Sequence, residues 1–552
     1  MSKYDLREKN TMISGADIMV KCLKAEGVDT VFGYPGATIC PFYDSLYDSD
    51  IKHILVRQEQ NAAHAASGYA RARMKPGVCV ATSGPGATNL ITGIATAYTD
   101  SIPMIAITGQ VRSDLLGRDV FQEADITGAC EPFTKHSYLV SRTEDLPRVF
   151  KEAFHIATTG RPGPVLIDIP MDIQTNEIES FEYPETVNLR SYKPNTKGHT
   201  VQVKRAIELI KQAKRPIIVS GGGVLSSGAK LKLQKFAEMT QIPVLSTMMG
   251  IGVMPSEHPL YLGMLGTHGR RCANKALHLT DLAIVCGARL GDRAIAAPDQ
   301  MSVRTKIIHI DIDPAEIGKN VKVDIPIVGD MNNVLKNMIE NVEDFKINDE
   351  WDAQVKNLKA HYQSKISTFD GFVEPRTLIG KLSSMLKSKA ILCADVGQNQ
   401  IWCANNFRIR EGRFFTTGGM GTMGYSIPAA IGAKLGLQKR DVVVVCGDGS
   451  FQMSLNELST IVQNNLNIKI IVMRNYRLGM VRELQDNNYN GRHSATILNE
   501  APDIVALAKA YGIDSAEVSS NEDAEKYIGK IVESDKPFVL VCRVHPDTPS
   551  IL

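Results

Sequence analysis

The most informative polar residues follow two apolar runs in the last third of the chain. Gly447-Asp448-Gly449 comes directly after VVVVC, and Asn475 comes shortly after a second run, IKIIVM. Glycines let backbone N–H groups approach a phosphate, and carboxylate and amide oxygens are ligands that Mg²⁺ prefers. A Gly-Asp-Gly tripeptide alone is more often a simple turn after a strand. With Asn475 and strands on both sides, the pattern predicts a diphosphate bridged to the protein by Mg²⁺.

Two other segments are less specific by themselves. Glu59 stands just beyond a short apolar run and at the start of an Ala-rich segment, NAAHAASGYARA, which predicts a helix. A glutamate in a first helical turn is usually an ordinary partner of the helix dipole. TTGGMGTMGYSIPAAIGA (416–433) is a Gly-rich loop followed by small residues, a pattern compatible with any tightly packed strand–helix turn.

These residues need elements that bring them together, and the apolar pattern predicts such elements. Short β-branched runs alternate with longer amphipathic segments along the chain. They fall into three sets: 53–56, 78–84, 104–109 and 164–170; 216–223, 243–247, 282–288 and 307–313; 391–397, 442–449, 468–473 and 538–544. Such runs, bounded by Gly or Pro, indicate buried parallel strands with crossover helices. The predicted fold class is α/β, with three doubly wound, mostly parallel sheets whose strand ends collect ligands.

Two polar connectors separate these sets. One, 178–200, is rich in proline and charge, and the other, 341–357, is acidic and helix-like. They predict three domains, which agrees with the expectation for 552 residues. The predicted domains are residues 1–180, 195–340 and 365–552.

Composition narrows the class of protein. The 62 basic and 60 acidic residues leave a net charge of +2 and form no basic stripe, so no nucleic-acid partner is expected. Cys79, Cys286, Cys393, Cys446 and Cys542 lie in or beside apolar runs, outside any C-x-x-C pair, which predicts buried reduced thiols. The first residues resemble no leader, and no apolar stretch would span a bilayer. We therefore expect a cytoplasmic protein without a membrane partner.

The motifs together resemble those of thiamin-diphosphate enzymes. The resemblance implies that Mg²⁺ is bound by Asp448, Asn475 and the backbone carbonyl of Arg477. The family usually has two asparagines here, and the first is Arg474 in this chain. It also implies that Glu59 hydrogen-bonds N1′ of the aminopyrimidine, which favours the imino form that deprotonates C2 of the thiazolium. In the family this glutamate and the Gly-Asp-Gly motif meet across a subunit interface.

The resemblance extends to the remaining contacts of thiamin diphosphate. Met423 is implied to be the apolar residue that holds the cofactor bent, and the Gly421 carbonyl to meet its amino group. DVGQNQIW (395–402) resembles the family's upstream diphosphate loop, although the family commonly has His at Asn399. The residues implied to contact the diphosphate are Gly397, Gln398, Asn399, Gly447, Gly449 and Ser450.

Within this group, GRDVFQEADITGACEPFTKHSYLV (117–140) resembles the signature of the acetohydroxyacid synthase (acetolactate synthase) catalytic large subunit. The resemblance implies that Gln122 lies near the reacting carbonyl with Phe121 beside it. It implies that Arg293 pairs with the carboxylate of the acceptor, although a lone arginine is more often a surface residue. Leu484 stands where that family has a tryptophan near the acceptor, so the preference among acceptors is open.

Other segments resemble the FAD-binding region of the same family. They are 262–293, 221–223, 309–320 and 328–330. Packing glycines without a flavin would explain Gly221–Gly223 alone, but not the longer match. The implied FAD contacts are Arg161, Gly222, Gly223, Leu265, Gly266, Thr267, His268, Gly287, Arg289, Arg293, Asp311, Ile312 and Asp330. Three further departures from the family are Thr38 in Gly36-Ala37-Thr38, Met171 in place of Lys, and Gly291 in place of Asp.

The resemblance implies an enzyme that decarboxylates pyruvate and ligates the hydroxyethyl unit to a second 2-keto acid. The product would be 2-acetolactate from pyruvate or 2-aceto-2-hydroxybutyrate from 2-ketobutyrate, in branched-chain amino-acid biosynthesis. A pyruvate oxidase or a catabolic acetolactate synthase is the alternative. A flavin or nicotinamide dehydrogenase would leave Glu59, Asp448 and Asn475 without a role. The implied assembly is a homodimer or homotetramer, and a small regulatory subunit remains open as a further partner.

Overall fold

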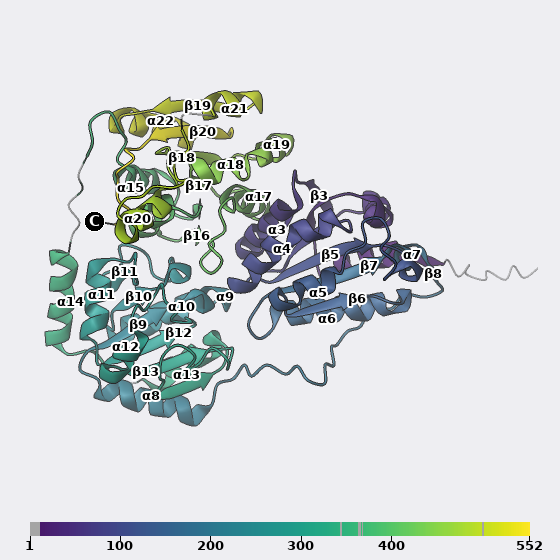
Figure 1. Cartoon of the computed structure of the whole chain (residues 1–552). Helices are drawn as coiled ribbons and strands as arrows, with labels where there is room; N and C mark the ends of the chain where they lie inside the picture. Colours follow the sequence, from purple (N-terminus) through teal and green to yellow (C-terminus); the bar gives the residue numbers. More distant parts are fainter. Residues whose placement is uncertain (1–11, 343–344, 363–365, 367, 500–501, 552) are drawn as a thin grey trace, which may run out of the picture. The chain divides into compact units, whose positions relative to one another are not determined.

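The computed structural model describes residues 12–342, 345–362, 366, 368–499 and 502–551 (Figure 1). It contains three six-stranded sheets, and every strand pair within each of them is parallel. Helices connect most of the successive strands, so the predicted α/β class is confirmed. Residues 1–11, where the sequence predicts no leader, lie outside the described part of the chain.

The first sheet is formed by the N-terminal part of the chain. Its strands, in spatial order, are β3 (Lys52–Leu55), β2 (Thr30–Tyr34), β4 (Gly77–Ala81), β5 (Met104–Gln110), β7 (Pro164–Pro170) and β6 (His136–Leu139). Its helices are α1 (Gly15–Ala25), α2 (Cys40–Tyr47), α3 (Glu59–Arg73), α4 (Pro85–Thr99), α5 (Ile126–Cys130), α6 (Leu146–Thr158) and α7 (Met171–Thr175). A short antiparallel pair, β1 (Ile13–Ser14) and β8 (Glu177–Ile178), closes this part.

The central sheet has helices on both faces. Successive side chains of its strands point to opposite faces, and because they are apolar on both, each face is covered by helices. Its strands, in spatial order, are β11 (Tyr261–Met264), β10 (Val244–Ser246), β9 (Pro216–Ser220), β12 (Leu282–Cys286), β13 (Lys306–Asp311) and β14 (Ile325–Val328). Ile218 packs with α8 (Thr200–Gln212), α10 (Lys230–Thr240) and α13 (Met331–Asn341), whereas Ile217 packs with α11 (Arg271–Leu279) and α14 (Asp349–His361). The remaining helices are α9 (Gly222–Ser226) and α12 (Pro298–Arg304).

The third sheet carries the C-terminal motifs. Its strands, in spatial order, are β16 (Arg413–Phe415), β15 (Ile391–Ala394), β17 (Val442–Gly447), β18 (Lys469–Arg474), β20 (Phe538–Arg543) and β19 (Asp514–Val518). Its helices are α15 (Pro375–Met385), α16 (Gln398–Asn406), α17 (Ser426–Gly436), α18 (Asp448–Gln452), α19 (Leu458–Gln463), α20 (Gly479–Asn488), α21 (Ile504–Ala510) and α22 (Asn521–Glu533). Single 3₁₀ turns are η1 (Ala37–Ile39), η2 (Ser113–Leu115), η3 (Glu131–Phe133), η4 (Thr143–Asp145), η5 (Met248–Gly250) and η6 (Leu455–Glu457).

The order of the strands in each sheet indicates where ligands are expected to bind. Numbered along the chain, the first and third sheets share one order, 2-1-3-4-6-5, and the central sheet has the order 3-2-1-4-5-6 of dinucleotide-binding folds. The winding direction reverses between β2 and β4 in the first sheet, between β9 and β12 in the central sheet, and between β15 and β17 in the third sheet. In the first and third sheets it reverses again at the far edge, where the last strand along the chain, β7 or β20, lies inside the strand before it. Ligands of open α/β sheets bind at the carboxyl ends of the strands beside such a reversal.

All twelve apolar runs identified in the sequence contain a strand of these sheets. The strands that the runs do not include are mostly edge strands, namely β6, β11, β14, β16 and β19. Three of these strands, β6, β16 and β19, contain polar or charged residues, and Gly263 and Pro326 interrupt the apolar residues of β11 and β14. The exception is β2, an interior strand of the first sheet, where Gly33 interrupts the apolar run. A Cβ at Gly33 would lie 2.4 Å from the carbonyl oxygen of Val80.

The chain divides into two compact units. One consists of the residues up to Ala70 together with Lys75–Lys193, and the other of Arg71–Met74 together with Pro194–Leu552. Residues 349–357 of the second predicted connector belong to α14, which packs on the central sheet through Trp351; its Nε1 donates to the Pro216 carbonyl (3.0 Å). The three domain ranges given above stay a prediction.

The cysteines behave as the sequence predicts. The ten are free thiols, and all except Cys40 are buried. Burial raises the pKa of the Cys79 thiol to about 12, which keeps it protonated and unreactive. Within the described ranges, none of the helices combines the length and apolar character needed to cross a membrane.

Candidate functional site

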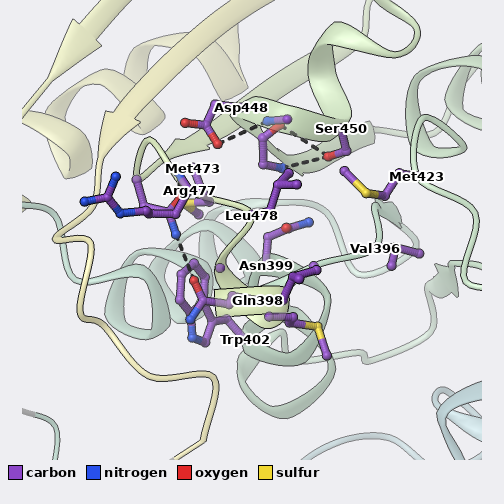
Figure 2. Close-up of a pocket in the computed structure, with 17 residues that line it drawn as sticks. Val396, Gln398, Asn399, Trp402, Met423, Asp448, Ser450, Met473, Arg477 and Leu478 are labelled. Carbon is purple, nitrogen blue, oxygen red and sulfur yellow. Dashed lines mark hydrogen bonds between the residues drawn. The ribbon is translucent and has the colours of Figure 1, made fainter. Parts of the chain in front are cut away.

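The loops that follow β15, β17 and β18 surround one cavity beside the reversal point of the third sheet (Figure 2). All the residues that the sequence predicts to hold thiamin diphosphate or Mg²⁺ in this part of the chain line the cavity, except Gly421. They are Gly397, Gln398, Asn399, Met423, Gly447, Asp448, Gly449, Ser450, Asn475 and Arg477. The fold therefore brings together side chains that lie far apart in the sequence.

Asp448 begins α18 immediately after β17 and is buried, with 4% of its surface exposed. Its carboxylate accepts hydrogen bonds from the backbone N–H groups of Gly449 (3.1 Å) and Tyr476 (2.8 Å). Burial raises the pKa of Asp448 to about 6, and these backbone bonds partly oppose that rise. A cation beside Asp448 would favour its charged form in the same way.

Asn475 follows β18 and is held by both ends of its amide. Its Nδ2 donates to Gln398 Oε1 (2.8 Å), and its Oδ1 accepts from the backbone N–H of Arg477 (3.1 Å). Gln398 in turn donates from Nε2 to Glu483 Oε1 (2.8 Å) and to the Thr548 carbonyl (2.8 Å). The backbone at Gly479 packs directly against the Gln398 side chain. A Cβ at Gly479 would lie 1.9 Å from Gln398 Oε1, so this position requires glycine.

The donors and glycines at this edge fit a metal-bridged diphosphate. Asp448 and Asn475 offer two hard oxygen ligands, of which only the Asp448 carboxylate is charged. This set suits a cation that also binds the charged oxygens of a diphosphate. In the described part of the chain, no three His, Cys, Asp or Glu residues are grouped to hold a metal. The site therefore suits a hard cation that shares its ligands with a phosphate better than a zinc ion.

Asn399, the departure from the family's histidine, is buried in the wall of the cavity. Its Nδ2 donates to the Asp395 carbonyl (2.7 Å) and to the Val445 carbonyl (3.3 Å). The Asn399 side chain thus links the loop after β15 to strand β17, and its amide N–H group donates to backbone carbonyls. Its Oδ1 lies close to Gly397 and Gly447, at 2.7 Å and 3.3 Å from the positions of an added Cβ.

Asp395 joins the two loops that flank the cavity. This carboxylate is 1% exposed and accepts from the backbone N–H groups of Val396 (2.9 Å), Gly424 (3.0 Å) and Ser426 (2.9 Å), and from Ser426 Oγ (2.6 Å). Burial raises its pKa, which the four hydrogen bonds oppose. Asp395 therefore sets the position of the loop that carries Met423 relative to the loop that carries Gln398.

We expect Asp395→Ala to lower the free energy of unfolding by about 3 kcal/mol, because it leaves three buried N–H groups without an acceptor. Urea denaturation followed by circular dichroism measures this loss. Asp50→Ala is the control, since Asp50 is largely exposed, pairs with Lys24 at the surface and should change stability far less. Equal stabilities of the two variants would contradict the linking role of Asp395.

Glu59 is the first residue of α3, at the carboxyl end of β3 in the first sheet. Its Oε2 accepts from Asn89 Nδ2 (2.9 Å), and a Cβ at Gly86 would lie 3.4 Å from Oε1. The Ala-rich sequence has a structural reason, because a Cβ at Gly93 of α4 would lie only 2.3 Å from the Cβ of Ala63 in α3. Small residues let α3 and α4 approach closely, and this packing holds Asn89 against Glu59.

Thr38, Phe121 and Gln122 lie at the same edge of the first sheet. The Thr38 hydroxyl is turned inward, where it contacts Thr82 Oγ1 (2.9 Å) and accepts from the Ser83 N–H (3.0 Å). The Phe121 side chain is 86% exposed. Gln122 has a positive φ of 61°, which is uncommon for a residue with a side chain.

Most of the residues predicted to contact FAD lie at the carboxyl ends of the strands of the central sheet. Gly222 and Gly223 follow β9, Leu265 to His268 follow β11, Gly287 and Arg289 follow β12, Asp311 and Ile312 end or follow β13, and Asp330 follows β14. A cavity of about 320 Å³ at this part is lined by Gly266 and Thr267 together with α11 and α12 residues. Asp330 caps α13 by accepting from the Asn333 N–H (3.2 Å).

The glycines of this edge are partly explained by packing. A Cβ at Gly221 would lie 2.1 Å from the Gly287 carbonyl oxygen, and one at Gly223 would lie 2.8 Å from the Gly287 Cα. These two glycines are therefore required by the approach of β9 to β12, whether or not a flavin is bound. Of the predicted FAD contacts only Gly266 and Thr267 line the cavity, so the dinucleotide-type strand order is the feature that fits FAD.

Two arginines predicted to bind ligands have other partners in this structure. Arg293 is largely exposed, with its Nε 3.8 Å from Asp292 Oδ2. Arg161 belongs to the first compact unit, where its Nε donates to Ser101 Oγ (2.8 Å) and its guanidinium lies over the Tyr98 ring.

The sequence analysis missed several polar residues that organise these edges. Asp395 and Asp168 lie inside apolar runs that predict strands, and Glu483 lies in α20. An acidic residue in or directly after a buried strand is costly unless it is hydrogen-bonded, so the two aspartates could have been singled out. The partner of Glu483, the Ser550 backbone N–H (2.7 Å), could not have been inferred from spacing.

Comparison with known proteins agrees with this geometry. Family models of thiamine pyrophosphate enzymes match three successive regions of the chain. The N-terminal TPP-binding domain matches residues 13–129, the central domain 203–338, and the C-terminal TPP-binding domain 395–542. The first and last of these contain Glu59 and the Asp448/Asn475 pair, respectively.

Curated relatives are similar over nearly the whole chain. The probable acetolactate synthase large subunit of Methanocaldococcus jannaschii is 46% identical, over 97% of this chain and 92% of the relative. The acetolactate synthase large subunit of Haemophilus influenzae is 43% identical over 96% and 94%, and the isozyme 3 large subunit of Escherichia coli 42% over 95% and 92%. The chain therefore belongs to the acetolactate synthase large-subunit family of thiamine pyrophosphate enzymes.

Proposed function

We propose that this protein is the catalytic subunit of an acetolactate synthase. It decarboxylates pyruvate and joins the remaining two-carbon unit to a second 2-keto acid, which gives 2-acetolactate from pyruvate or 2-aceto-2-hydroxybutyrate from 2-ketobutyrate. This reaction belongs to branched-chain amino-acid biosynthesis. The observation that carries the proposal is the convergence of Asp448, Asn475 and the neighbouring glycines on one cavity, in a chain of this family.

The residues of the third sheet hold the cofactor in this proposal. Asp448, the Asn475 amide oxygen and the Arg477 carbonyl bind Mg²⁺, and the backbone around Gly447–Gly449 receives the diphosphate. Met423 supports the cofactor in a bent form, and the Gly421 carbonyl meets its amino group. When bound, thiamin diphosphate supplies a carbon nucleophile and accepts the electron pair that is released with CO₂.

The residues of the first sheet contribute the proton and the substrate contacts. Glu59 binds N1′ of the aminopyrimidine through a hydrogen bond, and Asn89 orients the second carboxylate oxygen. Gln122 and Phe121 lie beside the reacting carbonyl, and Arg293 pairs with the carboxylate of the acceptor. We assign residues 1–180 to pyrimidine binding and residues 365–552 to diphosphate and Mg²⁺ binding.

We assign residues 195–340 to FAD, bound at the carboxyl ends of the central strands with a structural role. The strand order of the central sheet and the placement of most predicted contacts at its strand ends support this assignment. We further propose a homodimer or homotetramer with the active site at a subunit interface, and a small-subunit partner, since the relatives are named large subunits. Ten free thiols suit the cytoplasm.

The product formed from pyruvate tests the proposal. Purified protein is incubated anaerobically with pyruvate, Mg²⁺ and thiamin diphosphate, with and without FAD, and the products are identified by mass spectrometry. We expect 2-acetolactate and CO₂ in a ratio of one to one, without net reduction of the flavin. Acetate or acetyl phosphate formed together with reduced flavin would instead identify a pyruvate oxidase.

Leu484 provides a test of the preference among acceptors. It lies on α20, one helical turn after Met480 of the cavity wall, and its side chain is 52% exposed. One methylene in an apolar pocket is worth roughly 1–3 kcal/mol of discrimination, so the shape of the wall can decide the preference. We expect the wild-type enzyme to form mainly acetolactate when pyruvate and 2-ketobutyrate compete.

We expect Leu484→Trp to raise the acetohydroxybutyrate share of the products by roughly tenfold, because a flat aromatic face packs against the extra methyl group of 2-ketobutyrate. Leu484→Met is the control, since it keeps a flexible, non-aromatic apolar side chain of similar volume and should leave the ratio nearly unchanged. A strong preference of the wild type for 2-ketobutyrate would contradict the role given to Leu484.

A further inference from the structure

A buried carboxylate in the first sheet has no part in the chemistry proposed above. Asp168, on β7, is 1% exposed, and burial raises its pKa to about 7. It lies opposite Thr108 of the adjacent strand β5. Its Oδ1 accepts from Thr108 Oγ1 (2.7 Å), and its Oδ2 accepts from Gln110 Nε2 (2.9 Å).

Gln110 connects this carboxylate to a loop. The same Nε2 that donates to Asp168 also donates to the Ala124 carbonyl (2.8 Å), and Oε1 accepts from the Val111 N–H (2.9 Å). Gln110 is 3% exposed, so its amide is fixed at both ends inside the protein. Ala124 lies two residues after Gln122, in the loop 117–125.

The backbone of Gln122 is held in an unusual conformation. Its φ is 61°, and a Cβ at the facing Gly84 would lie 2.9 Å from the Gln122 Cβ. The Glu123 carboxylate accepts from the N–H groups of Gly117 and Val120 (3.2 Å for Val120), which folds the loop on itself. Those bonds shape the loop, whereas the Gln110 bond ties it to the sheet. A residue in a costly conformation needs such attachments to stay there.

We propose that Asp168 and Gln110 are positioning residues that set where Gln122 stands relative to the 2-keto acid. Asp168 fixes the orientation of the Gln110 amide, and Gln110 fixes the end of loop 117–125. The Asp125 carboxylate and Cys130 face Asp168 from the start and end of α5, so the same network also adjoins the helix that follows the loop. The inference rests on the proposed function, in which Gln122 contacts the substrate.

The geometry offers a matched pair of variants. Gln110→Met and Thr108→Val each remove one hydrogen bond to the Asp168 carboxylate and leave one buried oxygen without a donor. Only Gln110→Met also releases the Ala124 carbonyl and the Val111 N–H. The two variants therefore share the cost at Asp168 and differ in the bonds by which Gln110 holds Val111 and the end of the loop.

The first measurement is hydrogen–deuterium exchange of the free protein, without cofactor. We expect Gln110→Met to raise the exchange of amides in residues 117–125 by roughly tenfold, and Thr108→Val to leave it within about twofold of wild type. Asp168→Asn, which keeps the volume of the side chain, should loosen the same loop. Equal exchange in Gln110→Met and Thr108→Val would overturn the proposal.

The second measurement is a kinetic double-mutant cycle. We expect Gln110→Met to lower kcat/KM for pyruvate roughly tenfold, since displacement of a substrate contact by about 1 Å costs up to about 100-fold, and to leave thiamin diphosphate affinity unchanged. In a Gln122→Ala background the Gln110→Met substitution should cost little more, because it acts through Gln122. Additive effects would overturn the inference.

Failure of this inference is distinguishable from failure of the proposed function. If the wild type forms no acetolactate from pyruvate, the proposed function is wrong, and loop exchange in the two variants still reports whether Gln110 holds loop 117–125. If acetolactate forms but both variants match in exchange and in kcat/KM, the proposed function stands and the role of Gln110 is wrong.

Discussion

Glu59→Gln should slow hydrogen–deuterium exchange at C2 of bound thiamin diphosphate by roughly 10²–10⁴-fold, the range for loss of a positioned acid–base group. The amide has nearly the same size but cannot hold a proton shared with the aminopyrimidine N1′. We expect carboligation to fall by a similar factor, while the fold and cofactor affinity change little. Proton NMR of quenched samples measures the exchange, and circular dichroism checks the fold.

Asn89→Leu is the matched control for Glu59. It removes the hydrogen bond to Glu59 Oε2 and keeps the carboxylate. We expect a loss of about tenfold in C2 exchange, because the carboxylate remains but is less well oriented. Unchanged exchange in Glu59→Gln would remove Glu59 from the mechanism, and equal losses in both variants would indicate a role in structure only.

Asp448→Ala should weaken Mg²⁺ and thiamin diphosphate binding together. The carboxylate is the only charged member of the proposed ligand set, and even partners outside the ligand shell typically contribute 10–100-fold in affinity. We therefore expect Mg²⁺ affinity to fall by more than about 100-fold. Quenching of intrinsic fluorescence on cofactor binding, titrated at several Mg²⁺ concentrations, measures both affinities.

Ser450→Ala separates the metal from the diphosphate. Ser450 lines the same cavity, and its hydroxyl accepts from the Gly447 N–H (3.0 Å) without belonging to the proposed metal ligands. We expect weaker cofactor binding in this variant with an unaltered dependence on Mg²⁺. If Asp448→Ala binds cofactor with wild-type affinity at every Mg²⁺ concentration, the metal assignment is wrong.

The sequence by itself determined the elements with strong local signals. Continuous apolar runs indicated most of the interior strands of the three parallel sheets, because a strand buried on both faces needs apolar residues at every position. The same runs placed Asp448 and Asn475 at strand ends. Glycine and carboxylate chemistry then predicted a metal and a diphosphate at this edge, and the structure gathers these residues around one cavity.

Local signals failed where neighbours decide the structure. Strand β2, inside the first sheet, was missed because Gly33 replaces an apolar residue, and the close approach of Val80 and Tyr43 requires that glycine. Most edge strands were missed because polar residues, a glycine or a proline interrupt or shorten their apolar runs, whereas the apolar edge strand β3 was identified. The predicted connector 341–357 was expected to be helix-like and residues 349–357 do belong to α14, but the packing of Trp351 on the central sheet could not be inferred from the sequence. In each case the energy comes from contacts between residues distant in the sequence.

The tertiary structure alone decided how the site residues are held. Asp395 links Gly424 and Ser426 to the loop of Gln398, and Gln110 links Asp168 to Ala124. The partners in these networks are 14 to 58 residues apart, so no sequence spacing announces them. A buried carboxylate is stable only where the fold supplies its donors, and those donors exist only after the strands have assembled. The sequence therefore determines which residues can do the chemistry, and long-range packing determines where they stand.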